Sequence, residues 1–252
     1  MTQKIQQFIN DSFIARWSAL ILIALMMFFA YMFVDMLSPL KELLDTTLGW
    51  DSSTFGTYAA SEYFLNVFCF FLIFAGIILD KMGIRFTGLL SASLMVIGAV
   101  IKFYAVSDWF VGSELDATLT SWQFMDLPGT ALLACLGFMI FGCGCEMAGT
   151  TVSKSIAKWF KGKEMAMAMG LEMSIARLGV FAAMWLSPMV SDKFNASVSA
   201  PVAFGAVLLM IGLIFYFIFV LMDRKFDKQL EAAGELTEEA SEEEFKFSDL
   251  GK

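Results

Sequence analysis

Long apolar runs are the feature that most constrains how this chain can fold. A helix needs about 20 apolar residues to cross the hydrocarbon core of a bilayer. Six runs meet that length, at residues 17–38, 55–79, 86–106, 130–156, 165–190 and 202–222. Hydrophobic residues form 58% of the 252-residue chain, against about 45–50% in a soluble domain, so lipid must cover the excess. The sequence therefore predicts an all-α membrane protein with six transmembrane helices.

Basic residues indicate how those helices are oriented. Most Lys and Arg lie before the first run, in every second link and after the sixth run, whereas residues 107–129 hold none. The positive-inside rule then places both termini in the cytoplasm. We therefore expect a cytoplasmic N-terminal arm (1–16), a six-helix domain (17–222) and an acidic cytoplasmic tail (223–252), with residues 107–129 as the long outer loop.

Composition argues against several classes of function. The chain has no His, so a Ser/His protease or a histidine-based metal site is not expected. Its four Cys lie inside apolar stretches, where packing residues are expected. The net charge of −8 comes largely from the acidic tail, and no basic face for nucleic acid is present. We expect no enzyme activity, no cofactor and no metal site.

A polar motif follows the second apolar run. Gly76, Asp80, Lys81, Gly83 and Arg85 are spaced as G-x-x-x-D-K-x-G-x-R, which resembles the cytoplasmic loop signature of the major facilitator superfamily. Glycine at the fourth of these positions permits a turn with positive φ. The resemblance implies a gating loop between the second and third helices, in the N-terminal six-helix half of a carrier built from inverted three-plus-three repeats.

A second resemblance covers the fourth and fifth runs. Glu146 is followed by the link 158–164, Lys-Trp-Phe-Lys-Gly-Lys-Glu, and then by Ala176-Arg177-Leu-Gly. This is similar to the branch of the superfamily that contains the lysosomal dipeptide uniporter. The resemblance implies that dipeptides are carried, with Glu146 and Arg177 binding the peptide termini.

Among the charged residues inside the predicted spans, five stand out, because a charge at mid-membrane costs about 2.5–3.5 kcal/mol on insertion scales. They are Asp35, Glu62, Glu146, Glu172 and Arg177. At about 1.5 Å per residue, Glu146 and Arg177 fall near mid-membrane on neighbouring antiparallel helices. They could form a structural ion pair that fixes helix packing. Alternatively, they could bind the amino and carboxylate groups of a zwitterion.

For the remaining polar residues in the spans, the sequence allows several roles. Asp35, Glu62 and Glu172 could line a vestibule, titrate as proton-coupling groups, or lie at the interface. Tyr31 and Tyr58 could wall a substrate site or serve in packing. Lys102, near the outer end of the third run, is expected to snorkel to the interface.

The sequence therefore predicts a secondary carrier or uniporter, working by alternating access, for a small zwitterionic solute such as a dipeptide or amino acid. The alternatives are a non-transporting membrane subunit or scaffold, or a carrier of another organic anion. One six-helix half would expose its polar face, so we expect a second half as partner: a separate chain, a homodimer partner or a missing C-terminal half. The absence of a targeting signal favours a prokaryotic inner membrane.

Overall fold

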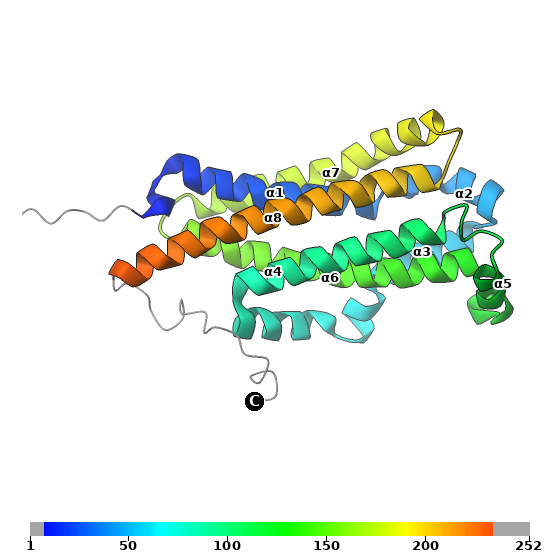
Figure 1. The fold of residues 1–252 in the computed structure, drawn as a ribbon, viewed down its shortest axis with the longest axis horizontal. Coiled ribbons are helices and arrows are strands. Elements are labelled where there is room, and N and C mark those ends of the chain that lie inside the picture. The colour runs from blue at the N-terminus through cyan, green and yellow to red at the C-terminus, as the bar shows by residue number, and fades with distance from the viewer. Residues whose placement is uncertain (1–7, 234–252) are drawn as a thin grey trace, which may run out of the picture.

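A computed structural model describes residues 8–233, and every regular element in that range is helical (Figure 1). Most of the predicted acidic tail, from residue 234, lies outside the described residues. The elements are η1 (Ile9–Asp11), α1 (Phe13–Val34), η2 (Ser38–Leu40), α2 (Lys41–Leu48), α3 (Ser52–Phe68), α4 (Phe71–Ala105), α5 (Glu114–Ser121), η3 (Phe124–Asp126), α6 (Gly129–Trp159), α7 (Met165–Lys193) and α8 (Ser199–Ala233).

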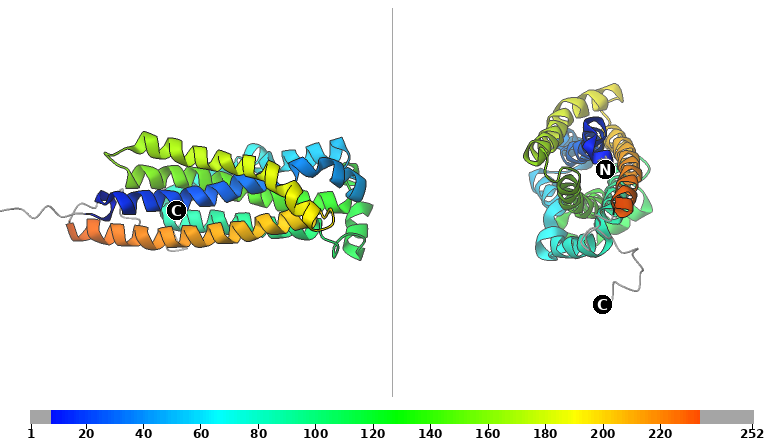
Figure 2. Two further views of the ribbon diagram at one scale, coloured as in Figure 1. Left: turned by 90° about the horizontal axis from the view of Figure 1, so that it is seen from above. Right: turned by 90° about the vertical axis from the view of Figure 1, so that its left-hand side faces the viewer.

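The long helices lie side by side along one axis and form a bundle when seen from its end (Figure 2). Among the described residues, five segments are long and apolar enough to cross a membrane: α1 continued through α2, α4, α6, α7 and α8. Helix α8 runs past the predicted end at residue 222 to Ala233. It returns to the end of the bundle where the N-terminal arm lies, since the Ile9 amide donates to the Gln229 Oε1 atom at 2.7 Å.

The second predicted span is not one continuous helix, which corrects the expectation for residues 55–79. Helix α3 stops at Phe68, and Phe70 takes a left-handed conformation with φ of 52° before α4 begins. Neither Gly nor Pro marks this break in the sequence. Helix α4 then holds the end of the second run and all of the third, bent at Gly83. The φ of 71° and ψ of 175° at Gly83 suit glycine, which lacks a Cβ.

Helix packing follows a symmetric pattern. Helix α6 packs on α3 and α4, and α1 packs correspondingly on α7 and α8, while α4 and α8 meet each other. If α1 is exchanged with α6, α3 with α7 and α4 with α8, the same set of helix pairs is obtained. An inverted three-plus-three repeat requires such a pattern.

Small residues let the helix backbones approach each other. A Cβ atom added at Gly98 would lie 2.4 Å from the Gly137 carbonyl oxygen, and one at Gly179 would lie 2.2 Å from the Phe28 carbonyl oxygen. These contacts join α4 to α6 and α7 to α1. Without a hydrophobic force between helices in lipid, such close approach is a main source of packing energy.

The predicted outer loop is partly ordered. Residues 107–129 contain α5 and η3, and α5 begins at Ser113, whose side chain accepts a hydrogen bond from the Asp116 amide. Trp109 and Trp122 are exposed in this segment, as expected for aromatic residues at a membrane interface.

Ion pairs fasten the described part of the N-terminal arm to the link between α6 and α7. Arg16 pairs with Glu164 at 3.1 Å, and Lys163 pairs with Asp11 at 2.8 Å. The hydrogen bond from Lys163 holds the pKa of the Asp11 carboxyl below its ordinary value. The arm therefore lies against the bundle from η1 onward.

Two glycines of α6 provide a matched test of close packing. A Cβ at Gly144 would lie 2.6 Å from the Ser91 carbonyl oxygen, whereas one at Gly149 would have no neighbour within 4 Å. We expect Gly144→Ala to lower the free energy of unfolding by about 1–3 kcal/mol through overpacking. Gly149→Ala should leave it unchanged or raise it by up to about 1 kcal/mol through helix propensity. Thermal unfolding of the detergent-purified chain measures both, and equal losses would contradict the packing account.

Candidate functional site

Four of the charged and aromatic residues predicted for the site come together at mid-bundle. Tyr31 lies on α1, Glu146 on α6, and Glu172 and Arg177 on α7. The Arg177 guanidinium carbon lies 4.9 Å from the centroid of the Tyr31 ring. The Tyr31 hydroxyl interacts electrostatically with Arg177, Glu146 and Glu172. Three helices thus supply one group of polar side chains around Tyr31.

Glu146 and Arg177 do not form the ion pair that the sequence allowed, since the described residues include no contact of that kind between them. Helix α7 packs chiefly on α1, and α6 packs chiefly on α4 and α3, so α6 and α7 share little contact. Arg177 is exposed, Glu146 is partly exposed and Glu172 is buried. Both members of the expected pair are therefore available to a third group.

Tyr58 is not part of this group. It is buried on α3, its ring stacks on Phe138 with centroids 4.8 Å apart, and Trp50 lies 5.2 Å away. Its hydroxyl has no hydrogen-bond partner among the described residues. The structure places Tyr58 in an aromatic core with Trp50 and Phe138.

Lys102 corrects the expectation that it snorkels. Its side chain is fully buried, and its Nζ atom donates a hydrogen bond to the Phe33 carbonyl oxygen at 3.4 Å. The rings of Phe33, Phe138 and Tyr58 lie 4.4, 4.3 and 5.2 Å from Nζ. Snorkelling assumed a side chain pointing away from the bundle, but α4 is rotated so that Lys102 points inward.

Two carboxylates lie near Lys102. Glu62 of α3 is buried, with 4% of its surface exposed. Asp35 follows the end of α1, and its Oδ1 atom accepts a hydrogen bond from the Ser38 hydroxyl. Lys102 interacts electrostatically with both. The predicted vestibule residues of the outer half thus share a buried cation that the sequence interpretation did not include.

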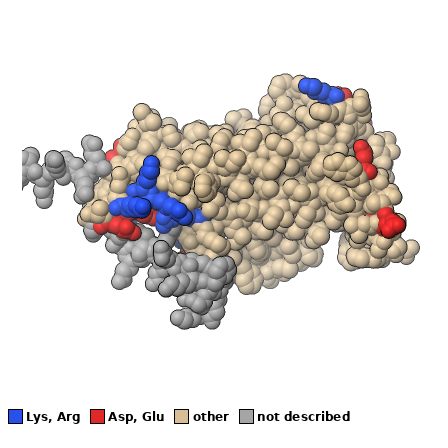
Figure 3. Space-filling view, in the orientation of Figure 1, with Lys and Arg blue, Asp and Glu red and all other residues tan. Residues whose placement is uncertain are grey.

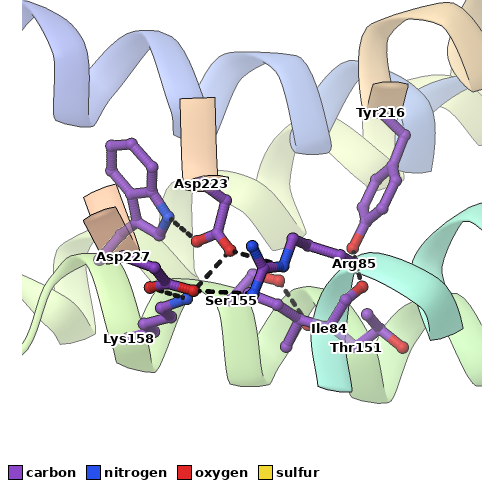
Figure 4. A network of polar contacts seen from close by, with 9 residues as sticks. Ile84, Arg85, Thr151, Ser155, Lys158, Tyr216, Asp223 and Asp227 are labelled. Carbon is purple, nitrogen blue, oxygen red and sulfur yellow. Dashed lines mark hydrogen bonds and ion pairs between the residues drawn. The ribbon is translucent and has the colours of Figure 1, made fainter. Parts of the chain in front are cut away.

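The loop motif lies at the other end of the bundle, in a network of ion pairs (Figure 4). The Arg85 Nη2 atom is 2.9 Å from Asp227, and its Nε atom is 3.7 Å from Asp223. Lys158 of α6 contacts the same two carboxylates at 2.9 and 2.7 Å. Asp223 also accepts a hydrogen bond from the Trp159 indole at 2.9 Å. The network joins α4, α6 and α8.

Other motif residues have separate surroundings. Asp80 is exposed and pairs with Lys154 at 2.9 Å, and Lys81 is also exposed. A Cβ at Gly76 would meet nothing within 4 Å. Beyond the Gly83 turn, the Tyr216 hydroxyl donates to the Ile84 carbonyl oxygen at 2.7 Å. The motif is therefore tied to α6 and α8 from Asp80 onward, and only its first residue, Gly76, has open space beside it.

Sequence reasoning missed Asp223 and Asp227 as members of this network. Both were counted with the segment after the last span, where only the basic residues informed the topology. Their spacing of four residues places them on the same face of a helix. Two acidic residues with that spacing, directly after an apolar run, could have indicated that the last helix continues and presents both carboxylates on one face. Among residues 8–233, no group of His, Cys, Asp or Glu is arranged to hold a metal ion.

The comparisons with known proteins settle the family. The family model described as "Major Facilitator Superfamily" matches residues 23–249. The chain belongs to the major facilitator superfamily. Membership places it in a family of membrane transport proteins, as its loop motif predicted.

Two curated relatives carry the printed name "Lysosomal dipeptide transporter MFSD1". The protein from Bos taurus is 30% identical over 148 residues, which cover 58% of this chain and 27% of the relative. The protein from Gallus gallus is 28% identical over 103 residues, covering 38% of this chain and 23% of the relative. The chain thus matches about a quarter of the length of each relative. No solved structure was found to match it.

The buried part of the ion-pair network at the loop motif should contribute more to stability than its exposed part. The Asp223 side chain is 0% exposed, whereas the Asp80 side chain is 79% exposed. We expect Asp223→Ala to lower the free energy of unfolding by about 3–5 kcal/mol, because it leaves buried cations uncompensated. Asp80→Ala should cost less than about 1 kcal/mol. Unfolding curves of the two purified variants test this, and similar losses would contradict it.

Proposed function

We propose that this chain is the N-terminal six-helix half of a carrier for a small zwitterionic solute. In this proposal α3 and the first part of α4 together form the second of six membrane crossings, and both termini are cytoplasmic. The distribution of charge supports the orientation. Figure 3 shows most of the visible Lys and Arg near the end of the bundle where α8 ends, with acidic side chains among them, whereas acidic side chains and a single basic patch are visible at the opposite end.

The observation that carries the proposal is the arrangement of Glu146 and Arg177. Opposite charges near mid-membrane stand around Tyr31 without forming an ion pair with each other. A charge in this position is costly unless it has a partner. A zwitterion supplies one: its amino group pairs with the Glu146 carboxylate, and its carboxylate accepts two hydrogen bonds from the Arg177 guanidinium. Contact with the Tyr31 ring holds that guanidinium in place.

The printed name of the two relatives favours dipeptides as the solute. Free amino acids remain the second choice, since they offer the same two charged groups. Glu172 is buried beside Tyr31 and contributes negative charge to the inner side of the site. The relatives' name refers to lysosomal proteins, so a prokaryotic inner membrane stays a prediction from the sequence.

A second six-helix half is the proposed partner. Helix α7 is the least buried of the five candidate spans. It exposes large apolar side chains, namely Met173, Leu178, Phe181, Trp185 and Met189. Gly76 is also open, at the first part of the loop motif. Covering these surfaces would enclose the polar group around Tyr31 between two halves.

Uptake of a labelled dipeptide, glycyl-leucine, tests the site in vesicles that contain the chain with its second half. We expect Glu146→Gln and Arg177→Ala each to reduce uptake roughly 10- to 150-fold, because each removes a hydrogen bond to a charged group worth about 1.5–3 kcal/mol. Glu114→Gln, on exposed α5, is the matched control and should transport normally. Normal uptake by either site variant at normal membrane abundance would overturn the assignment.

A further inference from the structure

Helix α8 presents one continuous exposed face from the middle of the bundle to its end. The exposed apolar side chains on this helix follow helical spacing, at Val207, Met210, Ile214, Phe217, Ile218 and Leu221. In the next two turns, the exposed positions of the same face hold Arg224, Lys225 and Lys228. Spacings of three and four residues keep these side chains on one side of the helix. The face therefore changes from apolar to basic between Leu221 and Arg224.

This change falls where a phospholipid changes from acyl chain to headgroup. The apolar part of α8 that ends at Leu221 is about 20 residues long, which matches the hydrocarbon core of a bilayer. At about 1.5 Å per residue, Arg224 lies about 4.5 Å beyond Leu221, and Lys228 about 10.5 Å. The polar layer on each side of a bilayer is about 5–7.5 Å thick. Long basic side chains in these positions can reach the phosphate groups of that layer.

The opposite face of α8 fixes the rotation of this part of the helix. Asp223 and Asp227 are buried, and both pair with Lys158 of α6. Between them, Phe226 packs on the Trp159 ring with centroids 5.2 Å apart. Because these contacts hold one face of α8 inward, the basic residues are held outward as a group. A preformed arrangement of this kind loses little conformational freedom when an anion binds.

The three cations of this face have no acidic partner within residues 8–233. Other basic residues at the same end of the bundle do form ion pairs, namely Arg16, Arg85, Lys154, Lys158 and Lys163. Figure 3 shows basic side chains gathered near the end of α8. The exposed acid Glu231 follows one turn beyond Lys228, further from the apolar stripe. The positive charge next to the stripe is therefore available to an external anion.

We propose that this face of α8 binds an anionic phospholipid. The acyl chains lie along the apolar stripe, and the phosphate is bound by Arg224, Lys225 and Lys228. The Arg224 guanidinium can donate two parallel hydrogen bonds to a phosphate, and the two lysines add compact positive charge. A soluble phosphate offers the same anion but makes no use of the stripe that leads directly into the basic residues. The shape and charge of the face together therefore favour a lipid.

Competition between two lipids tests the proposal. The purified chain in a neutral detergent is mixed with equal amounts of phosphatidylglycerol and phosphatidylcholine that carry the same acyl chains. Native mass spectrometry then counts the lipids that stay bound. We expect the unaltered chain to retain phosphatidylglycerol in preference, because only its headgroup has a net negative charge. Equal retention of the two lipids by the unaltered chain would overturn the proposal.

Charge variants locate the binding. Replacing Arg224, Lys225 and Lys228 together with Gln should weaken phosphatidylglycerol binding at least about 10-fold, because each basic residue near an anionic lipid contributes roughly fivefold in affinity. These positions are exposed, so the buried ion pairs of α8 stay intact. Lys225→Gln alone should weaken binding roughly fivefold, and it keeps the test available should the triple variant not fold.

The matched control removes the same amount of charge elsewhere. It combines Lys41→Gln, Lys161→Gln and Lys193→Gln, which are exposed lysines outside α8. We expect this variant to keep its preference for phosphatidylglycerol. Equal losses in the two triple variants would show a general effect of net charge and contradict a site on α8.

Two other anions are distinguished in the same measurement. Excess glycerol phosphate carries the phosphate without acyl chains and should leave the lipid bound, whereas full displacement would assign the face to a soluble phosphate. The acidic segment 234–252 of this chain lies outside the described residues. Retention of phosphatidylglycerol only after its acids are replaced, at Glu238, Glu239, Glu242, Glu243 and Glu244, would assign the face to that segment. Either result would overturn the proposal, and neither bears on the carrier function, because no solute is used.

Discussion

Keeping charge out of lipid is the constraint on which the rest of this structure depends. A membrane-spanning bundle can place charges at its ends, where water reaches them, or must enclose them. At the end that holds the loop motif, Asp223 and Asp227 pair with Arg85 and Lys158. Toward the opposite end, Lys102 is enclosed by aromatic rings. Between these ends, the helices approach each other closely at glycine residues.

Two polar centres result, and they differ in what completes them. The group around Tyr31 holds opposite charges from α6 and α7 that do not satisfy each other, which suits a ligand with both charges. In the other group, Glu62 and Asp35 lie near the buried Lys102, so both signs of charge come from within the chain. Both involve the last part of α1, since Tyr31 lies in its final turn and Asp35 directly follows its end at Val34. Its position between α7 and the outer cluster lets one helix border both centres.

The loop motif that is typical of the major facilitator superfamily lies apart from both polar groups. The network at the loop motif lies far along the bundle from the Tyr31 group and connects α4, α6 and α8 through ion pairs (Figure 4). Ion pairs of this kind can open and re-form, whereas the glycine contacts between α4 and α6 cannot loosen without loss of packing. The structure thus combines a closely packed interior with ion pairs at the loop-motif end that can separate and re-form.

The sequence by itself determined the helical class, the family motif, the positive φ at Gly83 and the set of intramembrane charges, because hydropathy and glycine chemistry act locally along the chain. Only the tertiary structure decided which of those charges meet. Glu146 and Arg177 stay apart because α7 packs on α1, and Lys102 turns inward because of the rotation of α4. The break at Cys69 and Phe70 also has no local signal. Rotation and spacing of helices depend on every neighbour at once, so these features could not be predicted from any one segment.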